Sequence, residues 1–561
     1  MQPGSNSTKV TIAQAMYFEN LYNALLATNP LWLGLLTLVC YILHTVVYSL
    51  FFHPLAKHPG PLWARLSTIP SWWHTLKQDR HLWLFRLQER YGTTVRYRPD
   101  SVMLNTPDAF RSIFGPKGNN TKSQAYAFFP RHPEAQNTLG TIDNGAHGRK
   151  RRVLANAFSE RALRGYEPYV KANLDRWCEL LEAEVPEGQW SSSLNVADWM
   201  NWLVFDIMGD LCFSRSFGMK EKDSTLRYVI HLMDSMQSKL MPVSVSPIAP
   251  LVIWLKPRGL TWLLDHFAPA DIRNWSAWVD QALQERTASE EQTRLGQDES
   301  RIGKDFFHYI FQTFDKDTGN LGYTKDELWE ECQLLVVAGA DTTAIVLAGL
   351  LFYLVRTSDV QTRLADEVLA AFDSPEEIAP GPKLQSCVFL RAVINEGLRM
   401  TPPVAGLLER EVLPGGVVIQ GQYFPAGVNI SSSPYCLGYN EDIFLNPTEF
   451  RPERWVVGDK GPDGKTVSQE AVYEQERALS AFSAGSRGCI GKNLAWMEMS
   501  LVLAKLLFRF EIRRDPSNNL GGGDPLNGSP GRRNPDQYQT YDIFVSSRDG
   551  PMVQLKKRLR S

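Results

Sequence analysis

The hydrophobic pattern of the chain begins with one long apolar run. Residues 31–52 contain no Asp, Glu, Lys or Arg. A helix of this length can cross a bilayer, although a buried core helix is the alternative interpretation. The proline-rich segment 53–62 cannot continue a helix. We therefore expect a transmembrane anchor at 31–52 and a stiff hinge at 53–62, after an N-terminal segment of residues 1–30.

Downstream of the hinge, the pattern predicts a mainly helical protein with small β-sheets, an α+β class. The motif Thr324-Lys-Asp-Glu327 is a capping box, and small and apolar residues follow it as far as Arg356. We expect this long helix to belong to a single large domain, residues 63–561. Other segments with helical spacing are 82–91, 146–158, 196–209, 271–286, 384–400 and 492–510, and short strand-like runs lie at 94–98 and 101–104.

Stretches without periodicity are predicted to be loops. Residues 116–144 are rich in Gly, Asn, Pro and aromatic side chains, and 458–477 has the polar composition of an insertion. Residues 515–536 are rich in Gly, Pro and Asn, and we expect a mobile surface loop there. The last strands, Gln539–Ser546 and Pro551–Lys556, are expected to form a terminal hairpin.

The composition excludes several classes of protein. With 43% hydrophobic and 21% charged residues over 561 positions, the chain has the composition of a globular protein. A formal net charge of −2 argues against a general nucleic-acid binder. The seven cysteines form no C-x-x-C pair, which excludes zinc-finger and iron–sulfur spacings and fits a reducing compartment.

One cysteine in a glycine-rich turn carries the strongest chemical signal. Residues 482–491 read FSAGSRGCIG, and the helix predicted after them places Cys489 at a helix N-terminus. Free backbone N–H groups and the helix dipole favour a thiolate there. Arg487 adds a positive charge, and the glycines let a flat ligand approach the backbone. The turn suits a soft metal held by one thiolate; a structural cysteine is the alternative.

The spacing Phe-x-x-Gly-x-Arg-x-Cys-x-Gly resembles the haem-binding loop of the cytochrome P-450 family. The resemblance implies that Cys489 is the axial ligand of haem iron. It also assigns the cofactor-binding positions of the turn to Phe482, Gly485, Arg487 and Gly491.

A second motif lies in the middle of the long predicted helix. The run Ala338-Gly-Ala-Asp-Thr-Thr343 places polar side chains in an otherwise apolar helix. Thr342 can bond back to a carbonyl of the preceding turn, and the small residues leave room for a flat ligand. A kinked core helix is the alternative. The run is similar to the family's oxygen-activation motif, which implies that Asp341 and Thr342 relay protons.

Further matches follow the family's order along the chain. Glu396 and Arg399 lie three residues apart on a predicted helix and can form an ion pair. The family joins this pair to an arginine of a Pro-Glu-Arg-Trp element, here Arg454, in a structural network. His147 and Arg151, one helical turn apart, hold positions that face a haem propionate in the family. Arg410 matches another propionate-binding arginine.

Two surfaces are assigned through the same resemblance. Arg149, Lys150 and Arg152 belong to a run of four basic residues, which we interpret as a solvated face or as part of the surface that receives an acidic electron donor. Aromatic residues of the 116–144 loop, and Phe544 and Val545 at the tip of the terminal hairpin, are expected to line the substrate pocket. Residues 235–256 are apolar and broken by prolines, and are expected to contact the membrane surface or to pack in the core.

The resemblance implies a haem-dependent monooxygenase that inserts one oxygen atom of O2 into a lipophilic small molecule by hydroxylation, epoxidation or multistep oxidation. The expected cofactor is haem b, iron protoporphyrin IX. We recognise no flavin or NADPH module, so electrons are expected from a separate NADPH–cytochrome P-450 reductase, with cytochrome b5 as an optional second donor. The phrase FFHPLAKHPGP resembles membrane-anchored members from filamentous fungi, which points to secondary metabolite biosynthesis.

The charges around the apolar run predict its orientation. Lys57 and Arg65 follow the run and only Lys9 precedes it, so the catalytic part is expected to face the cytosol from the endoplasmic reticulum membrane as a single-pass protein. Asn6, in an Asn-Ser-Thr sequon, would then be a lumenal glycosylation candidate.

Two other functions are weighed against monooxygenation. A haem-thiolate isomerase or dehydratase would rearrange a peroxide without a reductase. Members of that kind commonly lack the acid–threonine pair, so Asp341 and Thr342 count against it. A non-catalytic haem sensor or carrier is the other alternative, and nothing in the sequence specifically supports it.

Overall fold

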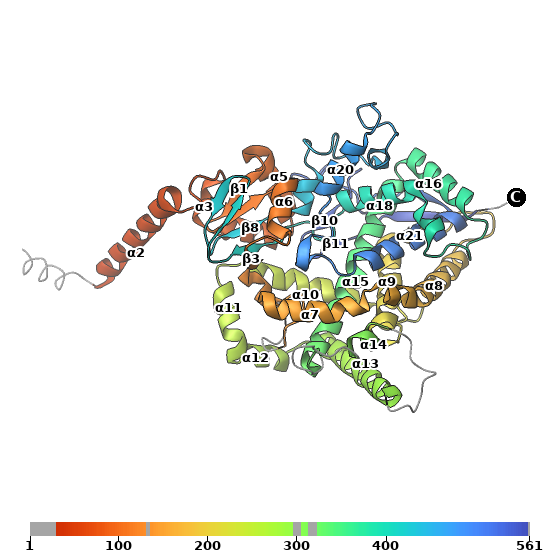
Figure 1. The fold of residues 1–561 in the computed structure, drawn as a ribbon, viewed down its shortest axis with the longest axis horizontal. Helices are drawn as coiled ribbons and strands as arrows, with labels where there is room; N and C mark the ends of the chain where they lie inside the picture. Colours follow the sequence, from red (N-terminus) through yellow and green to blue (C-terminus); the bar gives the residue numbers. More distant parts are fainter. Residues whose placement is uncertain (1–29, 131–134, 295–304, 312–321, 559–561) are drawn as a thin grey trace, which may run out of the picture.

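The computed structural model describes residues 30–130, 135–294, 305–311 and 322–558, and Figure 1 shows their arrangement. As the predicted class requires, helices make up most of the protein and the sheets are small. The helices and helical turns are α2 Pro30–Val47, η1 Tyr48–Phe52, α3 Leu62–Leu66, α4 Ile69–Leu76, α5 Arg80–Tyr91, α6 Pro107–Phe114, η2 Gln124–Phe128, α7 Asn144–Ala157, α8 Glu160–Ala183, α9 Val196–Phe213, α10 Tyr228–Ser244, α11 Ala249–Leu255, η3 Lys256–Arg258, α12 Leu260–His266, α13 Ala270–Arg294, α14 Phe306–Phe311, α15 Lys325–Leu354, α16 Ser358–Ala371, α17 Pro382–Gln385, α18 Val388–Met400, α19 Pro434–Gly438, η4 Pro452–Trp455, α20 Gln469–Ala478, η5 Gly485–Arg487 and α21 Lys492–Arg509.

The strands form sheets of five, three, two and two members. The largest has the order β1-β2-β8-β5-β3, in which only β2 and β8 are parallel. A three-stranded sheet has the order β4-β12-β9, and the pairs β6-β7 and β10-β11 complete the set. The strands are β1 Thr94–Arg98, β2 Ser101–Leu104, β3 Asn120–Lys122, β4 Leu194–Asn195, β5 Arg410–Val412, β6 Val417–Ile419, β7 Gln422–Phe424, β8 Asn429–Ser431, β9 Phe510–Arg514, β10 Thr540–Tyr541, β11 Ser547–Arg548 and β12 Met552–Lys557.

The long helix α15 runs through the centre of the molecule (Figure 1). Its first turn closes as the sequence predicts: the Thr324 hydroxyl accepts from the Glu327 N–H at 3.2 Å, and the Glu327 carboxylate accepts from the Thr324 N–H at 3.0 Å. Most side chains from Val336 to Leu354 are buried. A Cβ on Gly339 would lie 2.5 Å from the sulfur of Met208, so this glycine lets α15 approach α9 closely.

The apolar run at the N-terminus forms α2 and η1, and α2 extends away from the globular part (Figure 1). Among the residues that the structure describes, two helices are each long and apolar enough to span a bilayer, and their mean hydropathies are nearly equal, 2.0 for 31–52 and 2.1 for α15. Burial distinguishes the two helices, because 6% of the first apolar segment is buried inside the protein, compared with 72% of the apolar segment of α15. The exposed run fits a membrane anchor, whereas α15 is a core helix.

The chain immediately after α2 is held against the sheet. Arg96 of β1 donates to the Ser49 carbonyl at 2.8 Å and to its hydroxyl at 3.0 Å. Ser49 in turn donates to the carbonyl of Arg65 at 2.6 Å. Leu55 and His58 of the proline-rich segment are buried. The apolar helix α2 therefore joins the globular part through a folded connection.

Several predicted elements differ from those observed. The helix expected over 384–400 is two helices, α17 and α18, interrupted at Ser386 and Cys387. The polar insertion 458–477 contributes to a helix, α20, and the loop 116–144 contains β3 and η2. Of these elements, β3 is paired with β5, which lies far away in the chain, whereas α20 is capped locally by Ser468.

The C-terminal region differs most from its prediction. The hairpin consists of β10 and β11, whereas β12 pairs with β4 and β9 in another sheet. The glycine-rich segment 515–536 is packed against the protein: buried Arg532 donates to the carbonyl of Thr540 at 2.7 Å, and Gly523 donates to the carbonyl of Asn534 at 2.9 Å. Most residues of 515–536 are nevertheless exposed and form no long helix or strand, as predicted for a surface loop; that the loop is mobile stays a prediction.

Candidate functional site

The cysteine turn is closed by its own backbone. The Cys489 N–H donates to the Phe482 carbonyl at 2.8 Å, and the Gly488 N–H donates to the Gly485 carbonyl at 3.0 Å. Gly485 has a φ of +67°, and a Cβ there would overlap the carbonyl oxygen of Phe114. Only glycine satisfies both conditions. The glycine therefore seats the turn directly on the end of α6.

Cys489 lies just before α21 and is exposed, although the surrounding protein penalises its charged form. Burial raises the pKa of its thiol. The backbone N–H groups of Gly491 and Lys492 and the charge of Arg151 act in the opposite direction, as the helix-terminus argument predicts, but they are the smaller effects. Coordination to a metal ion would deprotonate the thiol. The sulfur can be reached from one side and is surrounded by protein on the others, so it suits a metal-containing ligand that packs against the turn.

A group of cations converges near this turn. Lys122, Arg151, Arg410 and Arg487 each act on the imidazole of His147, and together with burial, the largest cause, they lower its pKa to about 3. The buried imidazole of His147 is therefore neutral near pH 7. The sequence-predicted residues of α7, β5 and the cysteine turn thus share one electrostatic environment.

The hydrogen bonds that these cations donate go mainly to neutral oxygens. Arg487 donates to the carbonyls of Thr141 and Ile142 at 2.7 and 2.6 Å and to the side chain of Asn144 at 2.8 Å. Arg410 donates to the carbonyl of Glu409 at 3.0 Å. Burial and the charge of Arg410 lower the pKa of Arg487 to about 10. An anionic group beside them would offset this repulsion, so the donor set fits a ligand that carries carboxylates.

Lys122 is the member of this group that sequence reasoning missed. It lies in β3, within a stretch predicted to be a loop, and the register of β3 against β5 places it opposite Arg410. Its ammonium donates to the carbonyls of Leu139 and Thr138 at 2.6 and 3.2 Å. Burial and the neighbouring arginines lower its pKa well below the usual range. A single lysine in a non-periodic stretch offers no local signal, and only the strand pairing shows its position.

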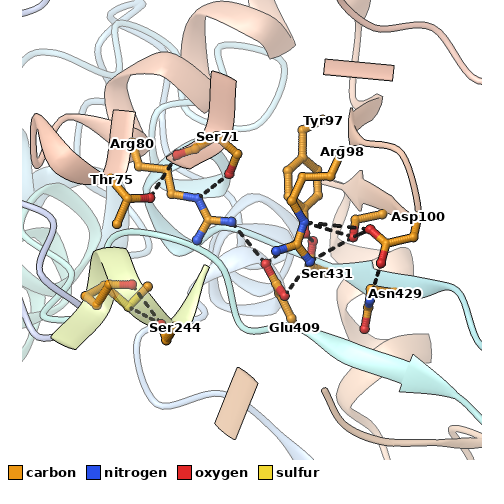
Figure 2. A network of polar contacts seen from close by, with 12 residues as sticks. Ser71, Thr75, Arg80, Tyr97, Arg98, Asp100, Ser244, Glu409, Asn429 and Ser431 are labelled. Atoms are coloured by element: carbon orange, nitrogen blue, oxygen red, sulfur yellow. Dashed lines mark hydrogen bonds and ion pairs between the residues drawn. The ribbon is translucent and has the colours of Figure 1, made fainter. Parts of the chain in front are cut away.

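A buried network holds the strand that carries Arg410 (Figure 2). The carboxylate of Glu409 accepts from Arg80 at 3.0 Å, from Arg98 at 2.9 Å and from the Tyr97 hydroxyl at 3.1 Å. Burial by itself would raise the pKa of Glu409, but the two arginines outweigh it and the pKa is lowered. The carboxylate therefore remains charged and ties α5 and β1 to β5.

The acid–threonine motif lies in the middle of α15. The Thr342 hydroxyl donates to the Ala338 carbonyl at 2.7 Å, one turn earlier, as the sequence predicts. Ala338 is exposed within this largely buried helix. Asp341 is buried and forms an ion pair with Arg548 of β11. Burial raises the pKa of Asp341, and Arg548 opposes that rise.

A second buried acid lies beside the same turn of α15. Thr343 donates to the carboxylate of Glu498, on α21, at 3.2 Å. Burial raises the pKa of Glu498 to about 8, so this group is protonated near neutral pH. Sequence analysis did not identify it because a lone glutamate within an apolar helix has no motif.

The predicted Glu396 network is present behind the site. Arg399 donates to both oxygens of Glu396 at 2.8 Å, and Arg454 of η4 donates to the same carboxylate at 3.2 Å. The side chains of Glu396 and Arg399 are fully buried. Burial would raise the pKa of Glu396, but Arg399 and Arg454 hold it below its usual value.

One part of the basic run does not lie where the sequence suggested. Lys150 is buried and forms an ion pair with Glu327 at 2.8 Å, and Arg149 pairs with the same carboxylate at 2.7 Å. These residues tie α7 to the start of α15. The interpretation of Lys150 as a surface contact for an electron donor was therefore wrong, whereas Arg152 is exposed.

Aromatic side chains from distant segments meet near the terminal hairpin. The rings of Phe129 and Phe544 lie 4.6 Å apart, and those of Tyr126 and Phe544 lie 6.3 Å apart. The 116–144 segment and the tip between β10 and β11 are therefore in contact, as a shared pocket wall requires.

The protein has a mainly helical fold, an accessible thiol at Cys489 and a cationic cluster near it, formed by Lys122, Arg151, Arg410 and Arg487. Such a protein can hold a prosthetic group that contains a metal and carries negative charge. The sequence model of the cytochrome P-450 family matches residues 59–524. The cytochrome P-450 monooxygenase apf7 of Gibberella fujikuroi is 31% identical over 95% of this chain and 99% of its own length. The monooxygenases poxM of Penicillium oxalicum (31%, 93% of each chain) and atnE of Emericella nidulans (31%, 95% and 97%) are similarly close.

The chain therefore belongs to the cytochrome P-450 family and is an oxidoreductase that incorporates oxygen, of the fungal monooxygenase type. The predicted fold, enzyme class and family are confirmed. Haem is the cofactor that the family implies. The exposed Cys489 and the cations beside His147 fit such a group, because haem presents an iron to one side and carboxylates at its edge.

Proposed function

We propose that this protein is a membrane-anchored monooxygenase that oxidises a lipophilic small molecule in fungal secondary metabolism. The observation that carries the proposal is the exposed thiol of Cys489 in a rigid turn near a cluster of cations. Cys489 would hold the iron of haem b, with Phe482, Gly485 and Gly491 shaping the turn. His147, Arg151, Arg410 and Arg487 would hold the propionates, with Lys122 as a further cation. Bound haem supplies the activation of O2.

Asp341 and Thr342 of α15 would transfer protons to the reaction site. The overall reaction, RH + O2 + NADPH + H⁺ → ROH + H2O + NADP⁺, requires protons at a buried site. The Thr342 hydroxyl can turn from the Ala338 carbonyl toward the accessible face of the helix. Burial raises the pKa of Asp341 above its usual value, and a carboxyl group next to Thr342 in sequence is suited to exchange protons with it.

Aromatic residues favour a lipophilic substrate. Tyr126, Phe129 and Phe544 supply apolar surface where two distant segments meet, and such surface binds hydrocarbon and ring systems. The similar proteins are fungal monooxygenases, which supports a role in secondary metabolism. Hydroxylation, epoxidation and multistep oxidation all agree with this site.

The electron supply and location follow the same proposal. Electrons would come from NADPH through a separate cytochrome P-450 reductase, with cytochrome b5 as an optional donor. The exposed apolar α2 and η1 would anchor residues 53–561 on the cytosolic side of the endoplasmic reticulum, with residues 1–30 in the lumen. Asn6, the proposed glycosylation site, lies outside the described residues.

Exposed apolar side chains support an additional contact with the membrane. They lie on α11, on α12 and after it, at the same end of the molecule as α2 in Figure 1. The largest are Leu251, Trp254, Trp262, Leu264 and Phe267. Such a patch on a membrane-anchored protein is suited to the lipid interface.

Expression with a reductase, followed by untargeted product profiling, tests the proposed function. We expect a reductase-dependent oxygenated product that is absent from cells expressing Cys489→Ser. The reduced protein with carbon monoxide should show the red-shifted absorption band of thiolate ligation, and Cys489→Ser should lose it. Cys40→Ser, which removes the other exposed cysteine, is the matched control and should keep the band. An unshifted wild-type band would exclude Cys489 as the ligand, and product formation without a reductase would favour an isomerase.

A further inference from the structure

The carboxylate of Asp341 is held by a residue from the far end of the chain. Arg548 lies in β11, and its Nη1 donates to Asp341 while its Nη2 donates to the side chain of Asn201 on α9. The side chains of Asp341 and Arg548 are 7% and 2% exposed. A carboxylate this buried is stable only with a partner, and Arg548 is the cation with which it pairs.

The geometry of this ion pair differs from that of the structural network. Arg399 contacts Glu396 through two nitrogens and both carboxylate oxygens. Arg548 contacts Asp341 through one terminal nitrogen, and its Nε is buried without a hydrogen-bond partner in the part of the chain that the structure describes. Two-point contacts hold a carboxylate more tightly than one-point contacts. The Asp341 side chain is therefore oriented but less tightly held than Glu396.

The hairpin that carries Arg548 is itself fixed. Ser547, the preceding residue, donates to Asp234 of α10 at 2.7 Å, and Arg548 reaches α9 through Asn201. Ser546 donates to the carbonyl of Pro403 at 2.8 Å. Because β11 is held on several sides, the guanidinium has a defined position relative to α15.

We propose that Arg548 is the positioning residue of Asp341, fixing the side-chain orientation from which this carboxyl group exchanges protons with Thr342. The inference rests on the proposed function of Asp341 and Thr342 as the proton relay. Without Arg548, the carboxyl group would lose both its charge partner and its fixed direction. A displacement of about 1 Å at a catalytic group can reduce a rate on the order of a hundredfold.

A double-mutant cycle tests the proposal with the full-length enzyme, its reductase and the substrate found by product profiling. The variants are Arg548→Met, Asp341→Asn and the double variant, each normalised to its carbon monoxide band. The readout is product formed and hydrogen peroxide released per NADPH consumed, because failed proton delivery diverts the reaction to NADPH + H⁺ + O2 → NADP⁺ + H2O2. We expect Arg548→Met to lower product per NADPH about tenfold, and the double variant to match Asp341→Asn alone.

Two further variants separate positioning from stability. Arg548→Lys keeps a cation and should restore product per NADPH to within about threefold of wild type. Arg532→Met removes another buried arginine of the same region, one that donates to the Thr540 carbonyl of the hairpin, and should lower the melting temperature while leaving product per NADPH unchanged. If Arg548→Met does not retain haem, Arg548→Gln takes its place in the cycle.

The outcomes are distinct. The proposal would be overturned if Arg548→Met lowered product per NADPH by the same factor in the wild-type and Asp341→Asn backgrounds. It would also be overturned if Arg532→Met lowered product per NADPH as much as Arg548→Met does. Non-additivity together with recovery in Arg548→Lys would support it. A wild-type enzyme without the shifted band or a reductase-dependent product would instead refute the proposed function.

Discussion

At the scale of single residues, the proposed proton transfer at the accessible face of α15 depends on one hydroxyl group, that of Thr342. The Thr342 hydroxyl donates a hydrogen bond to the Ala338 carbonyl at 2.7 Å. This bond defines the position of the hydroxyl oxygen, and the O–H can turn to another acceptor. Asp341, its neighbour, forms an ion pair with Arg548. Each side chain therefore has its own contact in addition to the proposed proton exchange between them, and their roles can be tested by separate substitutions.

Thr342→Ala should uncouple NADPH consumption from product formation. We expect product per NADPH to fall on the order of tenfold and peroxide to rise, because general acid–base groups contribute at least that much. Thr342→Ser, which keeps the hydroxyl, is the matched control and should stay close to wild type. Stoichiometry of NADPH, O2 and peroxide measures the effect. Unchanged coupling in Thr342→Ala would exclude this hydroxyl from the relay.

Glu498 predicts a pH dependence of stability. Its folded-state pKa is about 8, raised by burial, whereas an exposed glutamate titrates near pH 4.3. Between these values the folded state binds a proton that the unfolded state has lost, so stability decreases as pH rises, by about 1.4 kcal/mol per pH unit from this group. Glu498→Gln removes this contribution.

Thermal melts at pH 5, 6.5 and 8 test that dependence. The melting temperature of Glu498→Gln relative to wild type should increase steadily over this range. Thr343→Val, which removes the hydrogen-bond donor to Glu498 and leaves the acid in place, should retain the wild-type slope. Parallel curves for wild type and Glu498→Gln would show that Glu498 does not titrate in this window.

At the scale of elements, buried carboxylates join segments that are distant in sequence. Glu396 joins α18 to η4, Glu409 joins β5 to α5 and β1, and Glu327 joins α15 to α7. Each is charged because arginine or lysine outweighs the cost of burial. Removing one member leaves an uncompensated buried charge.

Glu396→Ala should therefore destabilise the protein severely. We expect a loss on the order of 3–5 kcal/mol, because Arg399 and Arg454 would remain buried without their carboxylate. Glu449→Ala is the matched control: its ion pair with Arg451 is about half exposed and should contribute less than about 1 kcal/mol. Chemical denaturation and haem content measure both variants. Equal stability of the two would contradict the structural role of the Glu396 network.

At the scale of the whole molecule, the anchor and the globular part meet at a folded connection. Ser49 is buried there and accepts two hydrogen bonds from Arg96. The boundary between anchor and catalytic part therefore does not coincide with the end of the apolar run. Residues 48–52 are apolar in sequence, yet Ser49 belongs to the packing of the sheet.

Deletion of residues 1–47 should weaken membrane association, leaving only the contact proposed for α11 and α12, while preserving the carbon monoxide band. Deletion of residues 1–52 also removes Ser49, and we expect it to lower the melting temperature further, because Arg96 would lose its two hydrogen bonds to Ser49. Membrane fractionation and thermal melts compare the two. Membrane association of the shorter deletion at the full-length level would show that α2 is not the anchor.

Much of the architecture could be predicted because its signals are local. The capping box of α15, the apolar run of α2 and the limits of β1 and β2 depend on residues close in sequence. The cysteine turn is also local, since its glycines and its Phe482–Cys489 hydrogen bond lie within one loop. Family, cofactor class and candidate ligand follow from such motifs.

Contacts between distant segments required the tertiary structure. Lys122 joins the cationic cluster through strand pairing with Arg410, Lys150 turns inward to Glu327, and Arg548 reaches Asp341 across 207 residues of chain. No local pattern encodes these contacts, because burial and charge pairing depend on which segments pack together. The sequence by itself determined the fold class and identified Cys489, Asp341 and Thr342 as the candidate site residues; only the packing of α15 against β11 decided which cation faces the acid.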